Sequence, residues 1–248
     1  MSIDLLDSGL IYSKQVFESE EIKNFLLLVS KKPYIHKFGT RFWKNIELNQ
    51  HIVVFIKKAI SQIKDQISCC LTHDHVCESI LMTTVPGEQG QPIHADNYAP
   101  NDLMRWYTVG VCLSDINYST GTFNYIPGSQ RIFRNQSNKS IEDLYFQSQR
   151  EHNFYRKYFS NSNIKKISLK AGSVFCYDTA VLHQGTPNTS ENTERNVFFV
   201  TFGPTFNQWH SEVKEDAPSM AAALSSCRTS MSLKELDSFS RYNFKDFA

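Results

Sequence analysis

Residues 171–202 read AGSVFCYDTAVLHQGTPNTSENTERNVFFVTF, and this stretch carries most of the information about the fold. It contains two runs rich in β-branched and aromatic residues, 173–177 and 196–202, separated by a polar segment that contains Gly, Pro, Thr and Asn. Such runs, bounded by turn-forming residues, predict β-strands. We expect His183 in the loop beyond the first strand and Arg195 at the start of the second.

The same signals predict strands upstream and a mainly β fold with flanking helices. In addition to the two runs above, the expected strands are 79–85, 91–96, 106–113, 122–126 and 164–169. Strands at such irregular spacing indicate a sandwich or a barrel. Two helices precede them: one has Ser19 as its N-cap and ends at Pro33, and the other carries apolar residues at helical spacing from Ile52 to Ile67. Both are expected to support the sheet.

The length and composition indicate one folded domain. The chain has 248 residues, of which 41% are hydrophobic and 13% aromatic, so it can bury a sizeable core. We expect residues 1–78 to form a helical support, 79–203 the β core with an insertion at about 131–163, and 204–248 a tail. The helix expected at 140–159 within the insertion is either a lid or a solvated surface helix.

Charge and cysteine usage limit the class of partner and the compartment. Lys plus Arg number 26 against 25 for Asp plus Glu, giving a formal charge of +1, so neither nucleic acid nor an anionic membrane is the expected partner. The opening residues lack the pattern of a secretory signal, and no apolar run is long enough to span a membrane. The 6 cysteines form no disulfide pattern. We expect a cytoplasmic location.

His94-Ala95-Asp96, at the end of an expected strand, is the sharpest chemical feature. Side chains two positions apart on a strand point the same way, so an imidazole and a carboxylate would project together. With His183 brought alongside by strand pairing, they would form the facial triad of two histidines and one carboxylate that suits Fe(II). Its open positions leave room for a 2-oxo acid and O2, whereas zinc prefers a tetrahedral site and supplies no electrons.

Arg195 completes this set of residues. Its guanidinium is a planar, permanently charged fork that can hold the far carboxylate of 2-oxoglutarate through two parallel hydrogen bonds. The alternative is a surface salt bridge. An arginine that enters a strand as apolar as 197–200 would be costly if it faced the core unpaired, and this favours a bound anion.

At these residues the chain resembles the Fe(II)/2-oxoglutarate-dependent oxygenases of the phytanoyl-CoA dioxygenase family. The similar stretches are His94-Ala95-Asp96, residues 109–115, residues 121–129, Ala171-Gly172-Ser173, His183, Asn188 and Arg195. They span roughly residues 79 to 203. The resemblance implies a double-stranded β-helix (jelly-roll, cupin-like) core, iron held by His94, Asp96 and His183, and 2-oxoglutarate anchored by Arg195.

Two departures from the family pattern concern the neighbourhood of the site. Gln130 stands where the family has a histidine that is not a ligand, so the change concerns loop packing. Gly185 offers no hydroxyl where many relatives place a serine that contacts the cosubstrate, and Thr186 or Gln91 could substitute for it. Sister families are also distinguished here, because halogenating members lack the carboxylate that Asp96 supplies.

Substrate contacts are expected from residues beside the triad and beyond the last strand. The candidates are Asn97, Tyr98, Arg105, Trp106 and Trp209, with Tyr145 and Phe154 of the insertion. A pocket lined by aromatic side chains with a few polar groups suits a small organic molecule, which could be an amino acid, a lipid-like acid or a specialised-metabolite intermediate. The Cys69–Cys77 segment, which packs histidines and cysteines together, is either a zinc site or, as we expect, a polar turn.

The resulting hypothesis is a dioxygenase that uses Fe(II), 2-oxoglutarate and O2 to hydroxylate a C–H bond of a small molecule, with release of succinate and CO2. One alternative is a non-oxidative cupin-like isomerase or lyase with the same three ligands, which leaves Arg195 without a dedicated role. A second is a non-catalytic protein that retains the scaffold. A third is a nucleic-acid demethylase, which the near-neutral charge disfavours, as does Thr201 at a position where such enzymes usually carry a second arginine. The oligomeric state stays open.

Overall fold

The computed structural model describes residues 5–34, 36–38, 40–67, 75–91, 93–96, 106–131 and 163–203. Within them, antiparallel strands form a seven-stranded sheet in the order β1-β8-β5-β10-β4-β3-β2 and a three-stranded sheet in the order β7-β6-β9. The first sheet contains β1 (Leu10–Ser13), β2 (His36–Phe38), β3 (Arg41–Asn45), β4 (His75–Thr84), β5 (Tyr107–Cys112), β8 (Val174–Asp178) and β10 (Arg195–Gly203). The second contains β6 (Phe123–Tyr125), β7 (Lys165–Ile167) and β9 (His183–Gly185). The helices are α1 (Leu5–Ser8), α2 (Ser19–Ser30), α3 (Gln50–Ser61) and α4 (Lys64–Ile67).

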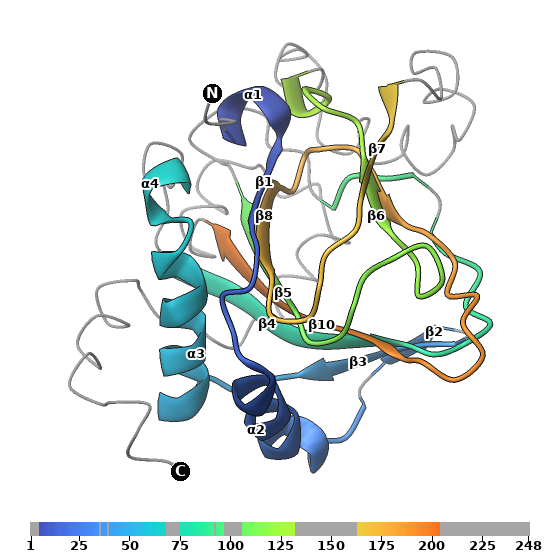
Figure 1. Cartoon of the computed structure of the whole chain (residues 1–248). Coiled ribbons are helices and arrows are strands. Elements are labelled where there is room, and N and C mark those ends of the chain that lie inside the picture. Colours follow the sequence, from blue (N-terminus) through green and yellow to red (C-terminus); the bar gives the residue numbers. More distant parts are fainter. Residues whose placement is uncertain are drawn as a thin grey trace, which may run out of the picture.

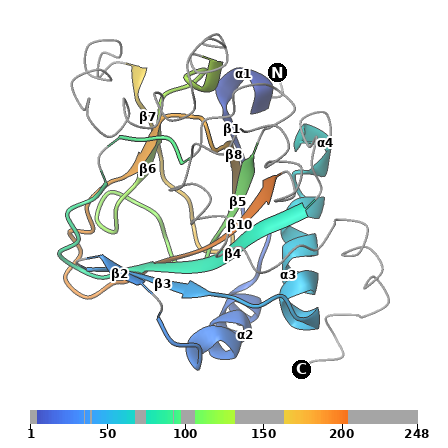
Figure 2. The same ribbon diagram turned by 180° about the vertical axis from the view of Figure 1, so that it is seen from behind.

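The two sheets face each other and form the double-stranded β-helix that the sequence predicts. Phe123 of β6 packs against two residues of β8, with ring centroids 5.2 Å from Phe175 and 5.3 Å from Tyr177. In Figure 1, α2 and α3 lie on the side of the large sheet opposite β6 and β7, and the view from behind in Figure 2 agrees. The large sheet is therefore covered on both faces.

The position of β10 in the sheet explains why residues 197–200 are apolar without interruption. Phe198 faces the helices and is fully buried, with its ring 4.7 Å from that of Phe25 and 6.1 Å from that of Phe55. Its neighbours Val197 and Phe199 point the other way, into the space between the sheets. Since successive side chains of a strand alternate between faces, a strand buried on both faces needs apolar residues at nearly every position.

The two predicted helices are present, with corrected ends. Helix α2 has Glu18 as its N-cap instead of Ser19, and the Glu18 backbone N–H donates to the Glu21 side chain at 2.8 Å. The helix expected to run on to Ile67 is broken, because α3 ends at Ser61 and α4 follows. At the break, the Ile63 N–H donates to the Ile60 carbonyl, three residues back, and this tighter turn ends the α-helix.

Two predictions near the candidate site, one of a strand and one of a loop, are wrong. The described residues of the expected strand 91–96, which are Gln91 and residues 93–96, do not form a strand, and His94 makes only an isolated bridge to His183. A reason is visible in the sequence, since Pro92 has no N–H to donate to a strand partner. His183 does not lie in a loop but begins β9, which pairs with β6.

The N-terminal part, expected to be a helical support, also supplies strands to the large sheet. Strands β1, β2 and β3 were not predicted, and β4 begins at His75 instead of Ser79. Among the described helices, none combines the length and hydropathy needed to cross a bilayer. The expected helix at 140–159, the tail 204–248 and most of the Cys69–Cys77 segment lie outside the described residues.

Replacing Phe198 with alanine should destabilise the fold strongly. This side chain is 0% exposed and joins the large sheet to α2 and α3, so its removal should lower the free energy of unfolding by about 3–5 kcal/mol. Urea denaturation measures this loss. Leu27→Ala on α2 is the matched control, because Leu27 is 60% exposed and its loss should change stability by less than about 0.5 kcal/mol. Similar losses for the two variants would contradict the packing described here.

Candidate metal centre

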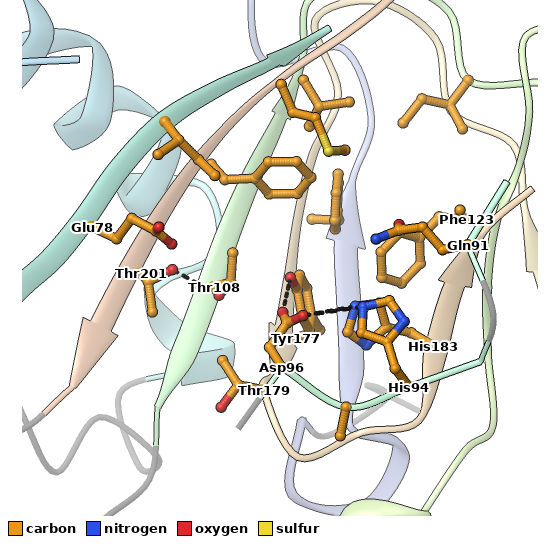
Figure 3. Close-up of a pocket in the computed structure, with 18 of the residues that line it drawn as sticks. Glu78, Gln91, His94, Asp96, Thr108, Phe123, Tyr177, Thr179, His183 and Thr201 are labelled. Atoms are coloured by element: carbon orange, nitrogen blue, oxygen red, sulfur yellow. Dashed lines mark hydrogen bonds and ion pairs between the residues drawn. The ribbon is translucent and has the colours of Figure 1, made fainter. Parts of the chain in front are cut away.

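A cavity of about 440 Å³ lies between the two sheets, and it contains three of the residues that the sequence singles out. His94, Asp96 and His183 line its wall, and one potential ligand atom from each lies within 4.8 Å of the others. Two imidazoles and a carboxylate at such separations can hold a divalent metal ion. Figure 3 shows the three side chains converging.

Backbone hydrogen bonds bring these residues together. The His94 N–H donates to the His183 carbonyl at 2.9 Å, and the His183 N–H donates back to the His94 carbonyl at 2.7 Å. Two residues further along, the Asp96 N–H donates to the Thr179 carbonyl at 2.9 Å. The segment 93–96 is thus fixed against β9 and the end of β8 without being a regular strand.

Both imidazoles direct the same nitrogen toward the same carboxylate oxygen. Asp96 Oδ1 lies 3.4 Å from His94 Nε2 and 3.5 Å from His183 Nε2. Burial raises the pKa of Asp96, but the charges and hydrogen bonds of His183 and His94 outweigh burial and hold this pKa well below its usual range. The carboxylate is therefore ionised at neutral pH, as a metal ligand must be.

The environment of His183 selects its tautomer. Its Nδ1 lies 3.0 Å from the carbonyl oxygen of Val181, and a carbonyl can only accept, so Nδ1 carries the proton. When the imidazole is neutral, the lone pair is on Nε2, the nitrogen that faces Asp96 and that would bind a metal ion. The Phe123 ring stacks on the imidazole at 5.1 Å with an interplanar angle of 11° and fixes its orientation. A hydrogen bond behind a histidine ligand is the usual support of a metal site.

Tyr177 holds the second oxygen of the carboxylate, and no feature of the sequence predicts this role. Its hydroxyl donates to Asp96 Oδ2 at 2.6 Å. Burial and the nearby Asp96 charge raise the pKa of Tyr177 well above its usual value, so the hydroxyl keeps its proton. With Oδ2 occupied in this way, Oδ1 alone faces the two imidazoles.

Arg195 lies at the start of β10, as expected, and its guanidinium is enclosed. Its Nη1 donates to the Thr186 carbonyl at 3.0 Å, whereas Nη2 is buried and has no hydrogen-bond partner among the described residues. Two glycines give it room, since a β-carbon at Gly121 would collide with Nη1 and one at Gly185 would lie 3.1 Å from Nη2. A buried donor without a partner, at the wall of a cavity, fits an anion bound there.

An ion pair outside the expected site residues lies beside Arg195. The buried side chains of Arg41 and Glu88 are paired, and Glu88 Oε2 accepts a hydrogen bond from the Gly90 N–H at 2.8 Å. Arg41 and Arg195 both pair in register with Thr84, so they lie in one row across β3, β4 and β10. Burial and the nearby charge of Arg41 lower the pKa of Arg195, whereas the charge of Glu88 raises it. The resulting pKa is about 10, so the guanidinium stays charged at neutral pH.

The remaining residues expected at the cosubstrate site have different positions. Gln91 lines the cavity, and its Oε1 lies near Gly185. Thr186 is not among the lining residues, because its hydroxyl is engaged by Thr122, accepting from the Thr122 N–H at 2.6 Å. Gln130 is fully buried beside Gly9, consistent with a role in loop packing.

Of the expected substrate contacts, Trp106 lines the cavity. The other candidates, Asn97, Tyr98, Arg105 and Trp209, lie outside the described residues. Glu78 also lines the cavity and was not expected there.

Comparison with known protein families identifies one match. Residues 31–197 match the family model described as Phytanoyl-CoA dioxygenase (PhyH), which covers more than half of the chain. This confirms the resemblance found in the sequence. No curated protein matches the chain.

Solved structures with the same fold come from proteins of low sequence identity. HygX from Streptomyces hygroscopicus, with nickel and 2-oxoglutarate bound, is 16% identical with a TM-score of 0.57, and the match covers 82% of this chain and 85% of that one. SnoN, a non-haem alpha ketoglutarate dependent epimerase from nogalamycin biosynthesis, is 11% identical with a TM-score of 0.61, covering 81% and 80%. SnoK, a carbocyclase from the same biosynthesis, is 15% identical with a TM-score of 0.56, covering 81% of each chain. At these identities the similarity establishes the fold alone.

Replacing Tyr177 with phenylalanine should weaken metal binding without unfolding the protein. The variant removes the donor to Asp96 Oδ2 and frees the carboxylate to rotate, and loss of such a supporting hydrogen bond typically costs about 10–100-fold in affinity. Competition with a chromophoric chelator for Co(II) measures the change. Tyr12→Phe on β1 is the control, because Tyr12 is 42% exposed and should leave the affinity unchanged. Equal Co(II) affinity in parent and Tyr177→Phe would show that Asp96 is held by other means.

Proposed function

Because this chain belongs to the phytanoyl-CoA dioxygenase family, we propose that it is a non-haem Fe(II)- and 2-oxoglutarate-dependent dioxygenase that hydroxylates a C–H bond of a small organic molecule. The single observation that carries the proposal is the presence of two sites in one cavity. One is the His94, Asp96 and His183 cluster, and the other is the enclosed guanidinium of Arg195, whose Nη2 has no hydrogen-bond partner among the described residues.

The donor set fits ferrous iron and the guanidinium fits a carboxylate. His94, Asp96 and His183 would hold the ion, and three protein ligands leave further positions open. Arg195 would bind the far carboxylate of 2-oxoglutarate, and Gln91 lines the wall close to it. When bound, iron with 2-oxoglutarate and O2 supplies the oxidising chemistry, in which the substrate C–H becomes C–OH and 2-oxoglutarate becomes succinate and CO2.

The chain's own contribution is to place these groups and to exclude water. Tyr177 and the Val181 carbonyl fix the orientations of Asp96 and His183. Apolar side chains of the large sheet, including Phe175 and Phe199, line the cavity between its polar ends. A site of this kind keeps water away from the reacting groups.

The alternatives account for fewer of these features. A non-oxidative isomerase or lyase would use the same three ligands and leave Nη2 of Arg195, which lacks a partner in the part of the chain that the structure describes, without a function. A non-catalytic role has no missing ligand to support it. A nucleic-acid demethylase is disfavoured by the formal charge of +1, and Thr201 pairs its hydroxyl with that of Thr108 at 3.0 Å. The sparse cysteines support a cytoplasmic location.

A second candidate reaction begins in the same way and ends differently. Proteins with this fold include an epimerase and a carbocyclase, so inversion of a stereocentre or closure of a ring could follow oxidation at a C–H bond. We favour hydroxylation because it needs no further group in the cavity. Product analysis by mass spectrometry separates them, since hydroxylation adds one oxygen atom.

Loading the parent protein anaerobically with Fe(II) and 2-oxoglutarate should produce a visible metal-to-ligand charge-transfer band. This band requires both molecules to bind at one site, so it tests the two sites together. His183→Ala should abolish it by removing a ligand, whereas His51→Ala, on the exposed side of α3, should leave it unchanged. A folded parent protein without the band would refute the proposed function.

Replacing Arg195 with lysine should weaken 2-oxoglutarate binding while preserving the charge. An ammonium cannot form two parallel hydrogen bonds with a carboxylate, so we expect the dissociation constant to rise by about tenfold or more. Calorimetric titration of the Ni(II)-loaded protein measures it. Arg131→Lys, an exposed arginine paired with Asp7, is the control. An unchanged constant in Arg195→Lys would mean that the far carboxylate binds elsewhere.

A further inference from the structure

A row of polar side chains crosses the end of the cavity opposite Arg195. In register across four strands lie Glu78 of β4, Thr201 of β10, Thr108 of β5 and Tyr177 of β8. All four line the cavity, and the two threonine hydroxyls lie 3.0 Å apart. Figure 3 shows Glu78, Thr201 and Thr108 on one side, with Asp96 and Tyr177 between them and the histidines.

The carboxylate of Glu78 has no cationic side chain beside it among the described residues that line the cavity. Arg195 is the one lysine or arginine in that set. It lies six residues before Thr201 on β10, which places the two about 20 Å apart along the strand. Arg195 also has Glu88 as its nearer anion, and Glu88 raises its pKa.

This position is unfavourable for an isolated anion. Glu78 is an exposed residue that lines the cavity beside Thr201. Partial removal from water raises the pKa of Glu78 to about 7, and the nearby charge of Asp96 adds to the rise, whereas Thr201 lowers this pKa. An anion that is partly removed from water and lies near a second anion is stabilised by a cation that binds between or beside them. The cavity therefore offers a binding position for a positive charge.

The surroundings of Glu78 indicate the rest of the ligand. In the next row of the same strands, Ile80 pairs with Phe199, and both line the cavity, as does the indole of Trp106. A molecule with its charged group at Glu78 would lie with its body against these apolar side chains. That body would then extend toward the His94, Asp96 and His183 cluster.

We propose that Glu78 binds a protonated amino group of the substrate, so that the molecules oxidised here are small amines with an apolar body. The inference rests on the proposed function, and it adds the substrate class and the residue that selects it. Thr201 is the register partner of Glu78 on β10 and lies beside it in the cavity wall.

A matched pair of probes tests this directly. Benzylamine and benzyl alcohol share the ring and the length and differ in the ammonium group. Binding of each to the full chain is measured by calorimetry at about pH 8, above the pKa of Glu78, where the carboxylate is ionised. We expect benzylamine to bind about tenfold or more tightly than the alcohol, and Glu78→Gln to remove most of this preference.

Two further variants show whether the effect comes from the charge. Glu78→Asp keeps a carboxylate and should retain part of the preference, which also keeps the test valid if the glutamine variant does not fold. Glu20→Gln, on the exposed surface of α2, should retain all of it. Equal binding of the two probes, no detectable binding of benzylamine, or a preference unaffected by Glu78→Gln would each overturn the assignment.

The titrations are run with and without Ni(II) and 2-oxoglutarate, so that the two proposals fail separately. If iron and 2-oxoglutarate produced no charge-transfer band but benzylamine bound through Glu78, the proposed reaction would be wrong and the amine site would stand. If the band formed and benzylamine showed no dependence on Glu78, the amine site would be wrong and the oxygenase would stand.

Discussion

The candidate site depends on one pair of backbone hydrogen bonds, those exchanged by His94 and His183 at 2.9 and 2.7 Å. These residues are far apart in the sequence, and side-chain contacts alone would not hold two imidazoles and a carboxylate together. The bridge fixes the segment 93–96 against β9, and β9 is itself fixed by pairing with β6. Because the constraint is made by the main chain, it is independent of whether a metal ion is bound. The ligands are thereby preorganised, which lowers the conformational entropy that metal binding would otherwise cost.

Strand β10 links this centre to the rest of the cavity. Its outward side chains, such as Phe198, pack on α2 and α3, and its inward side chains line the cavity. Along the inward face the chemistry changes from a guanidinium at Arg195, through Val197 and Phe199, to a hydroxyl at Thr201. The strand that stabilises the large sheet thus also sets the order of charged, apolar and polar surfaces in the cavity. A shift of β10 by one residue relative to its neighbours would turn its packing side chains toward the cavity and its cavity-lining side chains toward the helices. The packing on one face and the chemistry on the other therefore depend on the same register.

Residues with distinctive chemistry can be recognised in the sequence, whereas residues that act through the register of the strands cannot. His94, Asp96, His183 and Arg195 are identifiable because few structural roles need such side chains in that order. The strand predicted at 91–96 is wrong because strand-forming residue types alone do not provide a pairing partner, and Pro92 has no N–H to donate. Tyr177 was missed because only the fold brings its hydroxyl to Asp96. Glu78 could have been found: it has the same parity as Ile80 and Met82, but the strand was expected to begin at Ser79, one residue too late to include it.

The distribution of charge gives the cavity a direction. At one end Arg195 presents a donor that has no partner within the described ranges, in surroundings where Arg41 and Glu88 already neutralise each other. At the other end Glu78 and Asp96 are both acidic, and each disfavours a second anion nearby. A dicarboxylic acid that entered the wrong way round would place a carboxylate against Glu78, and a cationic substrate that entered too deeply would meet Arg195. In the proposed arrangement, repulsion at each end therefore adds to attraction and favours opposite ends of the cavity for the dicarboxylic acid and the cationic substrate.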